Sequence, residues 1–274
     1  MLLLRGIKIG VISFVVEVVN LYIKAGLFQL RLFFRKLVQK KPSYVKKRTG
    51  SQRLTCSRRC MGVLRKSIFL GRDNPNCKYN LDDNFFEIID AREKAYVLGW
   101  IGSDGHVACN KIEIGIKDVD VDILNKIRDI VCREIPVVAR NGKVFLTFNS
   151  TKMVADVCKW LRIFPGKKDK IVRMPFGIDF TWDFIRGYFD GDGTIRNPFK
   201  KRSLDCGIAS YSEGMKEDIK VFCKIPCTVS DGVIYFYTDS AISFLDKMYE
   251  NTDLYLNRKH DYYIIWKDRY KDKI

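Results

Sequence analysis

Residues 184–193 read FIRGYFDGDG, an apolar run with spaced glycines that ends in two carboxylates. A second copy, residues 96–105, reads YVLGWIGSDG. As helices, both runs place an aspartate, Asp104 or Asp192, in the last turn and a glycine directly after it, where we expect a left-handed C-cap. A carboxylate at that place faces the partial negative charge of the helix C-terminus. Because this unfavourable placement occurs twice, it indicates function, and a divalent cation bound between the two carboxylates would relieve it.

Both runs also carry glycines at helical spacing, Gly99 and Gly102 in the first and Gly187 and Gly191 in the second. Small residues on one side of a helix allow a second helix backbone to approach closely. Packing the two glycine strips together about a pseudo-twofold axis would bring the two aspartates side by side. The pattern therefore predicts one shared site built from both runs.

The same order of elements follows each run. Alternating apolar residues predict a strand over residues 106–117, and helical periodicity predicts a helix over residues 118–133. A hairpin turn at Asn141-Gly142 and a helix capped by Ser150 or Thr151 complete the first set.

In the second set, strand residues lie within 194–210, and a helix begins at Ser212 or Glu213. A turn at Asp231-Gly232 and a helix capped by Asp239 follow. The hairpin turns come 37 residues after the first motif aspartate and 39 after the second. The sequence therefore predicts an internal duplication, each half running helix, strand, strand, helix, hairpin, helix.

Composition narrows the class of partner. The 274 residues carry a formal net charge of +17, which favours a polyanion, with nucleic acid first and an anionic membrane surface second. The positive charge is spread over strands and linkers and not gathered on one amphipathic helix, which disfavours the membrane. The apolar segment 9–23 is too short and too polar to span a bilayer.

Nine cysteines in no secretory pattern indicate reduced thiols and an intracellular protein, whether cytoplasmic, nuclear, organellar or virus-encoded. Only two histidines accompany them, so a four-ligand zinc site is not expected. The run Asp190-Gly191-Asp192-Gly193 could open a calcium loop, but the fifth, sixth and twelfth positions hold Thr194, Ile195 and Lys201. An EF-hand requires Asp or Asn, Gly and Glu at those positions, so this interpretation fails.

The chain divides into four predicted segments. Residues 1–48 form a mostly helical extension that ends in a basic stretch containing Lys46, Lys47 and Arg48. This extension is either a degenerate helix-turn-helix that reads DNA or simply a basic helical pair. Residues 49–78 form a basic linker that suits phosphate contacts. Residues 79–165 and 166–274 form the two halves.

The two runs resemble the paired signature helices of the LAGLIDADG homing endonucleases. Residues 97–105 and 185–193 align with the nine-residue motif, and the resemblance covers roughly residues 79–270. The acidic residue at the eighth motif position falls on Asp104 and Asp192. The aspartate of the sixth position is kept at Asp190 and replaced by Gly102 in the first copy.

The resemblance implies an α+β protein with a duplicated αββαββα fold, pseudo-twofold, with two saddle-shaped antiparallel sheets and the small helical N-terminal extension. It also implies a monomeric, site-specific endonuclease that cuts double-stranded DNA at a long, partly asymmetric site and uses Mg²⁺ or Mn²⁺. Asp104 and Asp192 would be metal ligands, together with the carbonyls of Ser103 and Gly191. The candidate basic catalytic residues are Lys117, Lys152 and Lys259.

Polar strand positions are expected to contact DNA, namely Lys111, Glu113, Arg196, Lys201, Arg202, Ser210 and Ser212. The family also includes non-cleaving nucleic-acid binders and intron maturases, so intron RNA stays open as a partner. The presence of both motif aspartates favours cleavage, because a binder has no need of two carboxylates at a repelling interface.

Overall fold

The structure is a computed structural model, and it describes residues 78–166 and 171–271 of the chain. The predicted helical extension and the basic linker as far as residue 77 lie outside the described residues. Lys46, Lys47 and Arg48, predicted to contact DNA, lie there as well.

The described chain runs through the same series of elements twice. The first series consists of α3 (Arg92–Ser103), β1 (Gly105–Val107), β2 (Ile112–Lys117), the 3-10 turn η2 (Asp118–Asp120), α4 (Val121–Val131), β3 (Val138–Arg140), β4 (Lys143–Phe148) and α5 (Thr151–Leu161). The second consists of α6 (Thr181–Asp192), β5 (Gly193–Ile195), β6 (Asp205–Ala209), α7 (Glu213–Cys223), β7 (Thr228–Ser230), β8 (Val233–Tyr237) and α8 (Thr238–Met248). A further helix, α9 (Asn257–Lys271), follows the second series. The predicted duplication is confirmed.

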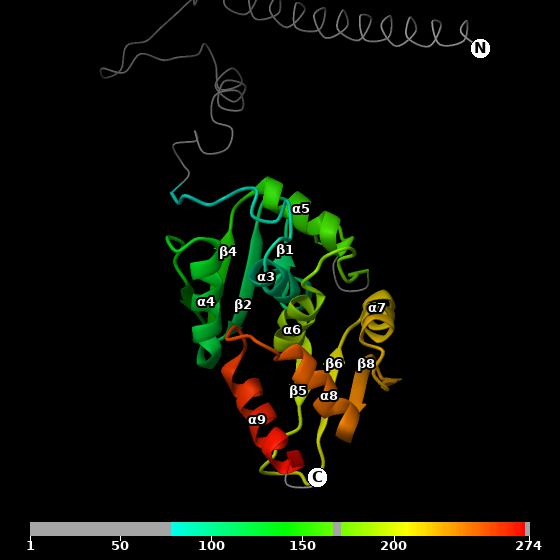
Figure 1. The fold of residues 1–274 in the computed structure, drawn as a ribbon. Coiled ribbons are helices and arrows are strands. Elements are labelled where there is room, and N and C mark those ends of the chain that lie inside the picture. The colour runs from blue at the N-terminus through cyan, green and yellow to red at the C-terminus, as the bar shows by residue number, and fades with distance from the viewer. Residues whose placement is uncertain (1–77, 167–170, 272–274) are drawn as a thin grey trace, which may run out of the picture. The chain divides into compact units, whose positions relative to one another are not determined.

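Each series builds one antiparallel sheet of four strands. The strand orders correspond, β1-β2-β4-β3 in the first sheet and β5-β6-β8-β7 in the second. The registers also correspond, since Gly105 lies opposite Ile114 and Gly193 opposite Ile208. Figure 1 shows α3 and α6 side by side, with strands of the first sheet beside α3 and strands of the second beside α6. The fold is therefore the duplicated α+β fold that the motif resemblance implies.

Both predicted hairpin turns form. Asn141 and Gly142 have φ angles of 51° and 71°, and Asp231 and Gly232 have φ angles of 50° and 77°. Two consecutive left-handed residues are what a two-residue type I′ turn requires, and Asn-Gly and Asp-Gly are the sequences that accept it.

The glycines after the two motif helices are not left-handed, which corrects the C-cap prediction. Gly193 has φ −87° and ψ 161°, and Gly105 already belongs to β1. Their role is to allow close approach, because a Cβ on Gly105 would lie 2.6 Å from the carbonyl oxygen of Ile101. A Cβ on Gly193 would lie 2.4 Å from that of Phe189. Each strand can therefore start directly against the last turn of its helix.

Two serines cap helices as predicted. The hydroxyl oxygen of Ser150 accepts the N–H of Met153 at 3.2 Å, and that of Ser212 accepts the N–H of Met215 at 3.3 Å. The predicted cap Asp239 is wrong, because β8 runs straight into α8 and Thr238 takes the first helical position with φ 47°. Asp239 lies instead in the first turn of α8.

One face of each sheet is buried under helices. Ile112, Ile114 and Ile116 of β2 are buried, as are Ile234 and Phe236 of β8. The alternate residues of these strands lie on the opposite face, which we call the open face. Within residues 78–166 and 171–271, no helix combines the length and hydrophobicity needed to cross a membrane.

Candidate active site at the paired motif helices

The backbones of α3 and α6 touch at glycines. A Cβ on Gly187 would lie 2.0 Å from the carbonyl oxygen of Tyr96 and 3.2 Å from the Cα of Gly99. A Cβ on Gly99 would lie 2.2 Å from the carbonyl oxygen of Phe184. Gly102 is different, since a Cβ there would meet the side chain of Tyr188 at 3.2 Å. Gly99 and Gly187 therefore form the backbone contact of the two helices, whereas Gly102 and Gly191 face side chains of the other helix.

The crossing brings the motif ends together. A Cβ on Gly191 would lie 2.0 Å from the Oγ of Ser103 and 3.2 Å from the Oδ2 of Asp104. Asp192 is the next residue and the last of α6. Asp104 is exposed and Asp192 half-buried, so both carboxylates stand at the accessible end of the helix pair.

Lys259 of α9 lies beneath this end. Its side chain is buried, and its Nζ donates to the carbonyl oxygens of Phe189 at 2.6 Å and Asp190 at 2.9 Å. Burial lowers the pKa of Lys259 to about 8, and the nearby charges of Asp190, Asp104 and Asp192 partly oppose that shift. Lys259 is thus the predicted basic residue that the structure brings to both motif aspartates.

Of the other two candidate lysines, one lies on α5 and one at the end of β2. Lys152 of α5 forms ion pairs with Glu87 at 2.9 Å and Asp156 at 3.0 Å, and the hydrogen bonds that it donates to these carboxylates raise its pKa. Lys117 is exposed at the end of β2, opposite Lys143 of β4. Lys117 therefore lies among strand residues of the open face.

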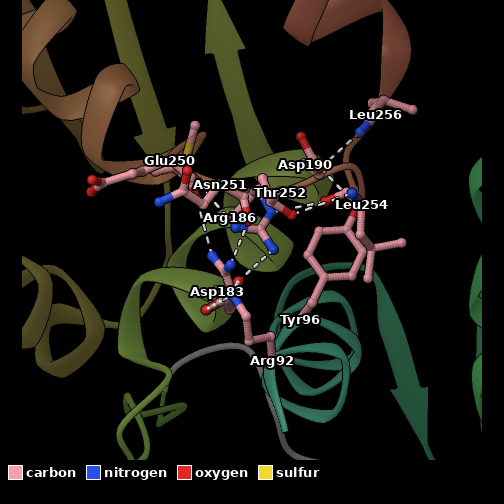
Figure 2. A network of polar contacts seen from close by, with 11 residues as sticks. Arg92, Tyr96, Asp183, Arg186, Asp190, Glu250, Asn251, Thr252, Leu254 and Leu256 are labelled. Carbon is pink, nitrogen blue, oxygen red and sulfur yellow. Dashed lines mark hydrogen bonds and ion pairs between the residues drawn. The ribbon is translucent and has the colours of Figure 1, made fainter.

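Asp190, at the sixth motif position, faces inward. The carboxylate is buried, and its Oδ2 accepts the hydroxyl of Tyr96 at 2.8 Å and the N–H of Leu256 at 2.9 Å (Figure 2). Its Oδ1 has no hydrogen-bond partner among the described residues. Burial raises the pKa of Asp190 despite the opposing charge of Lys259. This carboxylate joins α3, α6 and the start of α9, and does not point to solvent.

A buried arginine extends the same connection. Arg186 donates to the carbonyl oxygens of Leu254 at 2.8 Å and Met248 at 3.0 Å, and to Asp183 Oδ1 at 2.6 Å (Figure 2). Arg92 of α3 donates to the same Asp183 carboxylate at 3.1 Å. These bonds fix the segment between α8 and α9, and thereby the position of Lys259 in the first turn of α9.

Sequence reasoning missed this network. Asp183, Arg186 and Asp190 are spaced three and four apart on α6, whereas the aligned positions of α3 hold Ala95, Leu98 and Gly102. That difference between the two copies was the available signal. It indicates that only the second motif helix fixes a further helix through buried charges.

The predicted DNA-contact residues are divided between surface and interior. Lys111 and Glu113 lie on the open face of the first sheet and pair at 3.4 Å. Arg196 pairs with Asp205, and Lys201 and Arg202 are exposed in the connection between β5 and β6.

Ser210 and Ser212 are buried, which differs from the expectation of DNA-facing side chains. Ser210 bonds the hydroxyl of Tyr188 at 3.0 Å, and Ser212 donates to the carbonyl oxygen of Val172 at 2.6 Å while capping α7. Both hydroxyls are therefore used inside the protein.

The donor set at the motif ends suits a hard cation. No group of three or more His, Cys, Asp or Glu side chains in the described ranges is arranged to hold a metal ion. Mg²⁺ does not need such a group, since it binds through one or two carboxylates, waters and substrate phosphates. At Gly191 the missing side chain lets Ser103 and Asp104 approach the end of α6 closely. Asp104 and Asp192 therefore fit Mg²⁺ or Mn²⁺ in the presence of a phosphate ligand.

Comparison with known proteins gives one family-model match and several distantly similar solved structures. Residues 179–224, which contain the second motif helix, match the family model of the LAGLIDADG-like domain. The LAGLIDADG homing endonuclease I-GzeII in complex with its DNA target is 10% identical, with a TM-score of 0.46 over 65% of this chain and 91% of that one. The homing endonuclease I-WcaI bound to its DNA recognition sequence is 11% identical, with a TM-score of 0.45 over 73% of this chain and 96% of that one.

The N-terminal LAGLIDADG domain of DUF199/WhiA is 16% identical, with a TM-score of 0.40 over 63% of this chain and 89% of that one. No curated protein matches the chain in sequence. The family-model match, which covers the second motif run, confirms the resemblance to the LAGLIDADG family. The chain therefore carries a LAGLIDADG-like domain over residues 179–224, and its two series of elements repeat with matching strand orders.

Proposed function

We propose that this protein is a site-specific DNA endonuclease that makes metal-dependent double-strand cuts by phosphodiester hydrolysis. The observation that carries the proposal is the meeting of Asp104 and Asp192 at the α3–α6 crossing, above the buried Lys259. Two carboxylates at adjacent helix C-termini repel each other and the helix dipoles. A cation bound between these carboxylates and a phosphate would offset that repulsion.

Asp104 and Asp192 would hold the Mg²⁺ or Mn²⁺, with the carbonyl oxygens of Ser103 and Gly191 as further ligands. When bound, such ions polarise a phosphoryl oxygen, lower the pKa of a bound water and stabilise the leaving oxygen. Each half contributes one aspartate. One carboxylate for each strand of a duplex suits a cut in both strands, and because one chain supplies both, the proposed active form is a monomer.

Lys259 supports the carboxylate pair in two ways. Its two hydrogen bonds to the last carbonyls of α6 fix the helix end that carries Asp192. Its positive charge, in a buried setting of low dielectric, offsets part of the repulsion between the aspartates. We assign Lys259 as a positioning residue that acts through the two aspartates.

The open faces of the two sheets would bind the DNA. Antiparallel strands of this kind fit the major groove of B-DNA, and the net charge of +17 matches a polyanion. The exposed Lys201 and Arg202 beside β6 suit phosphate contacts, which need only charge and reach.

The test is a cleavage selection. The full chain is incubated with a randomised duplex library in Mg²⁺, with a parallel incubation in Ca²⁺, and the ends produced are sequenced. Defined double-strand ends that appear only with Mg²⁺ are the expected result. Selective binding with no ends in Mg²⁺ would overturn the catalytic proposal and favour a non-cleaving nucleic-acid binder, for which intron RNA is the next ligand to test.

A further inference from the structure

The open face of the first sheet is charged. His106, Glu113 and Thr147 lie side by side in one row across β1, β2 and β4. Thr147 donates to Glu113 Oε2 at 3.0 Å. Burial opposes the charged form of Glu113, but hydrogen bonds from Thr147 and Lys111 outweigh it and hold the pKa below its ordinary value. This row therefore presents an ionised carboxylate beside a lysine.

A second row on the same face is basic. Lys117, Lys143 and Arg140 lie across β2, β4 and β3 in register, and all three are exposed. The guanidinium of Arg140 lies 5.4 Å from the ring centroid of Phe145, which orients it along the strand surface. Side chains of this kind pair with the O6 and N7 acceptors of guanine, and a carboxylate pairs with the N4 donor of cytosine.

The open face of the second sheet carries mainly aromatic, apolar and uncharged polar side chains at the matching positions. Thr194, Gly207, Tyr235 and Thr228 form the row that corresponds to His106, Glu113 and Thr147. The rings of Tyr235 and Tyr237 are stacked, with centroids 6.0 Å apart. A Cβ on Gly207 would lie 3.1 Å from Tyr235 Cδ1 and 3.0 Å from Val233 Cγ1, so these side chains already cover the glycine backbone. Asp205, opposite Tyr237, forms an ion pair with Arg196.

The matching registers allow the open faces of the two sheets to be compared position by position. Because Gly105–Ile114 corresponds to Gly193–Ile208, Gly207 occupies the place of Glu113 and Tyr235 the place of Thr147. Likewise Ala209 and Val233 occupy the places of Gly115 and Phe145. The duplicated halves thus keep one backbone frame and differ in the chemistry they present.

We propose that the two sheets read half-sites of different composition, the first sheet reading G·C pairs through charged side chains and the second reading thymine methyl groups through Tyr235 and Val233. This inference rests on the proposed DNA binding. In the major groove, thymine is distinguished by its C5 methyl group, which apolar side chains contact. The half-site under the second sheet is therefore rich in A·T pairs.

The occupant of the open face of the second sheet is DNA and not a second protein. This face has the same strand arrangement as the open face of the first sheet, which carries a basic row. The exposed Lys201 and Arg202 lie next to it, before β6. Positive side chains beside an exposed strand surface match a duplex, whose phosphates flank the base edges of the groove.

The test uses base analogues in a duplex obtained by binding selection in Ca²⁺, so that it does not depend on cleavage. Replacing thymine by uracil removes only the methyl group, and replacing guanine by 7-deazaguanine removes only the N7 acceptor. Uracil is expected to weaken binding in one half-site, by roughly threefold to fivefold per thymine in contact. 7-Deazaguanine is expected to weaken binding in the other half-site.

Two variants assign each effect to a sheet. Tyr235→Thr restores the residue that the first sheet has at the matching position, and it is expected to abolish the uracil effect while the 7-deazaguanine effect persists. Lys143→Ala is expected to do the reverse. Circular dichroism checks that each variant is folded, and the analogue measurements on the unaltered protein decide the composition question even if a variant unfolds.

The outcomes separate this inference from the proposed function. If the selection recovers no duplex, DNA binding itself is refuted, and the inference falls with it. If duplexes are recovered but both analogues act equally in both half-sites, DNA binding stands and the inference is overturned. A uracil effect that survives Tyr235→Thr and disappears in Lys143→Ala would also overturn it.

Discussion

Substituting Gly187 by alanine tests the helix crossing that unites the two motif ends. The added Cβ would lie 2.0 Å from the carbonyl oxygen of Tyr96 and 3.2 Å from the Cα of Gly99. Carbon atoms in comfortable contact stand about 3.5–4.0 Å apart. Both obstacles are backbone atoms that no rotamer change can move, so α3 and α6 must separate by roughly 1 Å or more to regain normal contact.

Overpacking of this kind costs about 1–3 kcal/mol, and more where the surroundings cannot yield. Alanine returns up to about 1 kcal/mol of helix propensity relative to glycine. We expect a net loss of about 2 kcal/mol or more in the free energy of unfolding, the upper end of that cost less the returned propensity, because both contact surfaces are main chain. DNA cleavage should be lost as well, since separating the helices moves Asp104 away from Asp192.

Urea unfolding, followed by circular dichroism and by fluorescence of the buried Trp100 on α3, measures the change. Gly102→Ala is the matched control on α3, because its Cβ would meet the side chains of Tyr188 at 3.2 Å and Leu161 at 3.7 Å. That variant should stay within about 1 kcal/mol of the parent protein. A Gly187→Ala protein that unfolds at the parental urea concentration would refute the close crossing.

Three further predictions concern the surrounding residues. Arg186→Met should lower the free energy of unfolding, measured in urea or by heating, by about 3–5 kcal/mol, because it removes a buried cation beside Asp183. Lys271→Met, at the exposed pair with Asp268, is the control and should change nothing measurable. Equal effects of the two substitutions would contradict the network. The Lys259 pKa of about 8 is below the ordinary 10.5, so between these pH values the unfolded chain binds more protons than the folded one. The free energy of unfolding of the parent, relative to that of Lys259→Met, should therefore rise by about 3 kcal/mol from pH 8 to 10.5. A difference that does not change with pH would count against the burial of this lysine. Ser150→Ala should lower the free energy of unfolding by about 1 kcal/mol through loss of the α5 cap, while Thr151→Ala, one residue later, should have a smaller effect.

The duplication and the hairpins were predictable because they depend on local signals. Asn141-Gly142 and Asp231-Gly232 accept the left-handed conformations of a type I′ turn, and few other residue pairs do so. Alternation of apolar residues in β2 determined which face of the strand is buried. The spaced glycines of the two runs predicted that the motif helices cross closely.

The glycines directly after the motif helices show what local rules leave out. A glycine after a helix suggests a left-handed cap, yet Gly105 and Gly193 are required by contact with the preceding turn. The predicted cap Asp239 was wrong for a similar reason, since the strand β8 continues without a break into α8. Both errors concern how consecutive elements join.

The partners of the buried charges could not be predicted from spacing. Arg186 bonds carbonyls more than 60 residues away, and Lys259 bonds carbonyls about 70 residues before it. Three lysines were equal candidates in the sequence, because a lysine in a helix or strand is most often solvated. Tertiary packing distinguished Lys259 from Lys117 and Lys152 by burying it beneath the motif ends.

The most direct test of the central claim separates binding from cutting at the two motif aspartates. On one duplex obtained from the cleavage selection, the affinity in Ca²⁺ and the cleavage rate in Mg²⁺ are measured for the parent, Asp104→Asn and Asp192→Asn. We predict that each variant keeps its affinity within about tenfold and loses at least about a hundredfold in the rate of double-strand cutting, because each aspartate supplies a ligand for metal-assisted hydrolysis. Full-rate cutting by either variant would contradict the assignment of the paired motif ends as the active site.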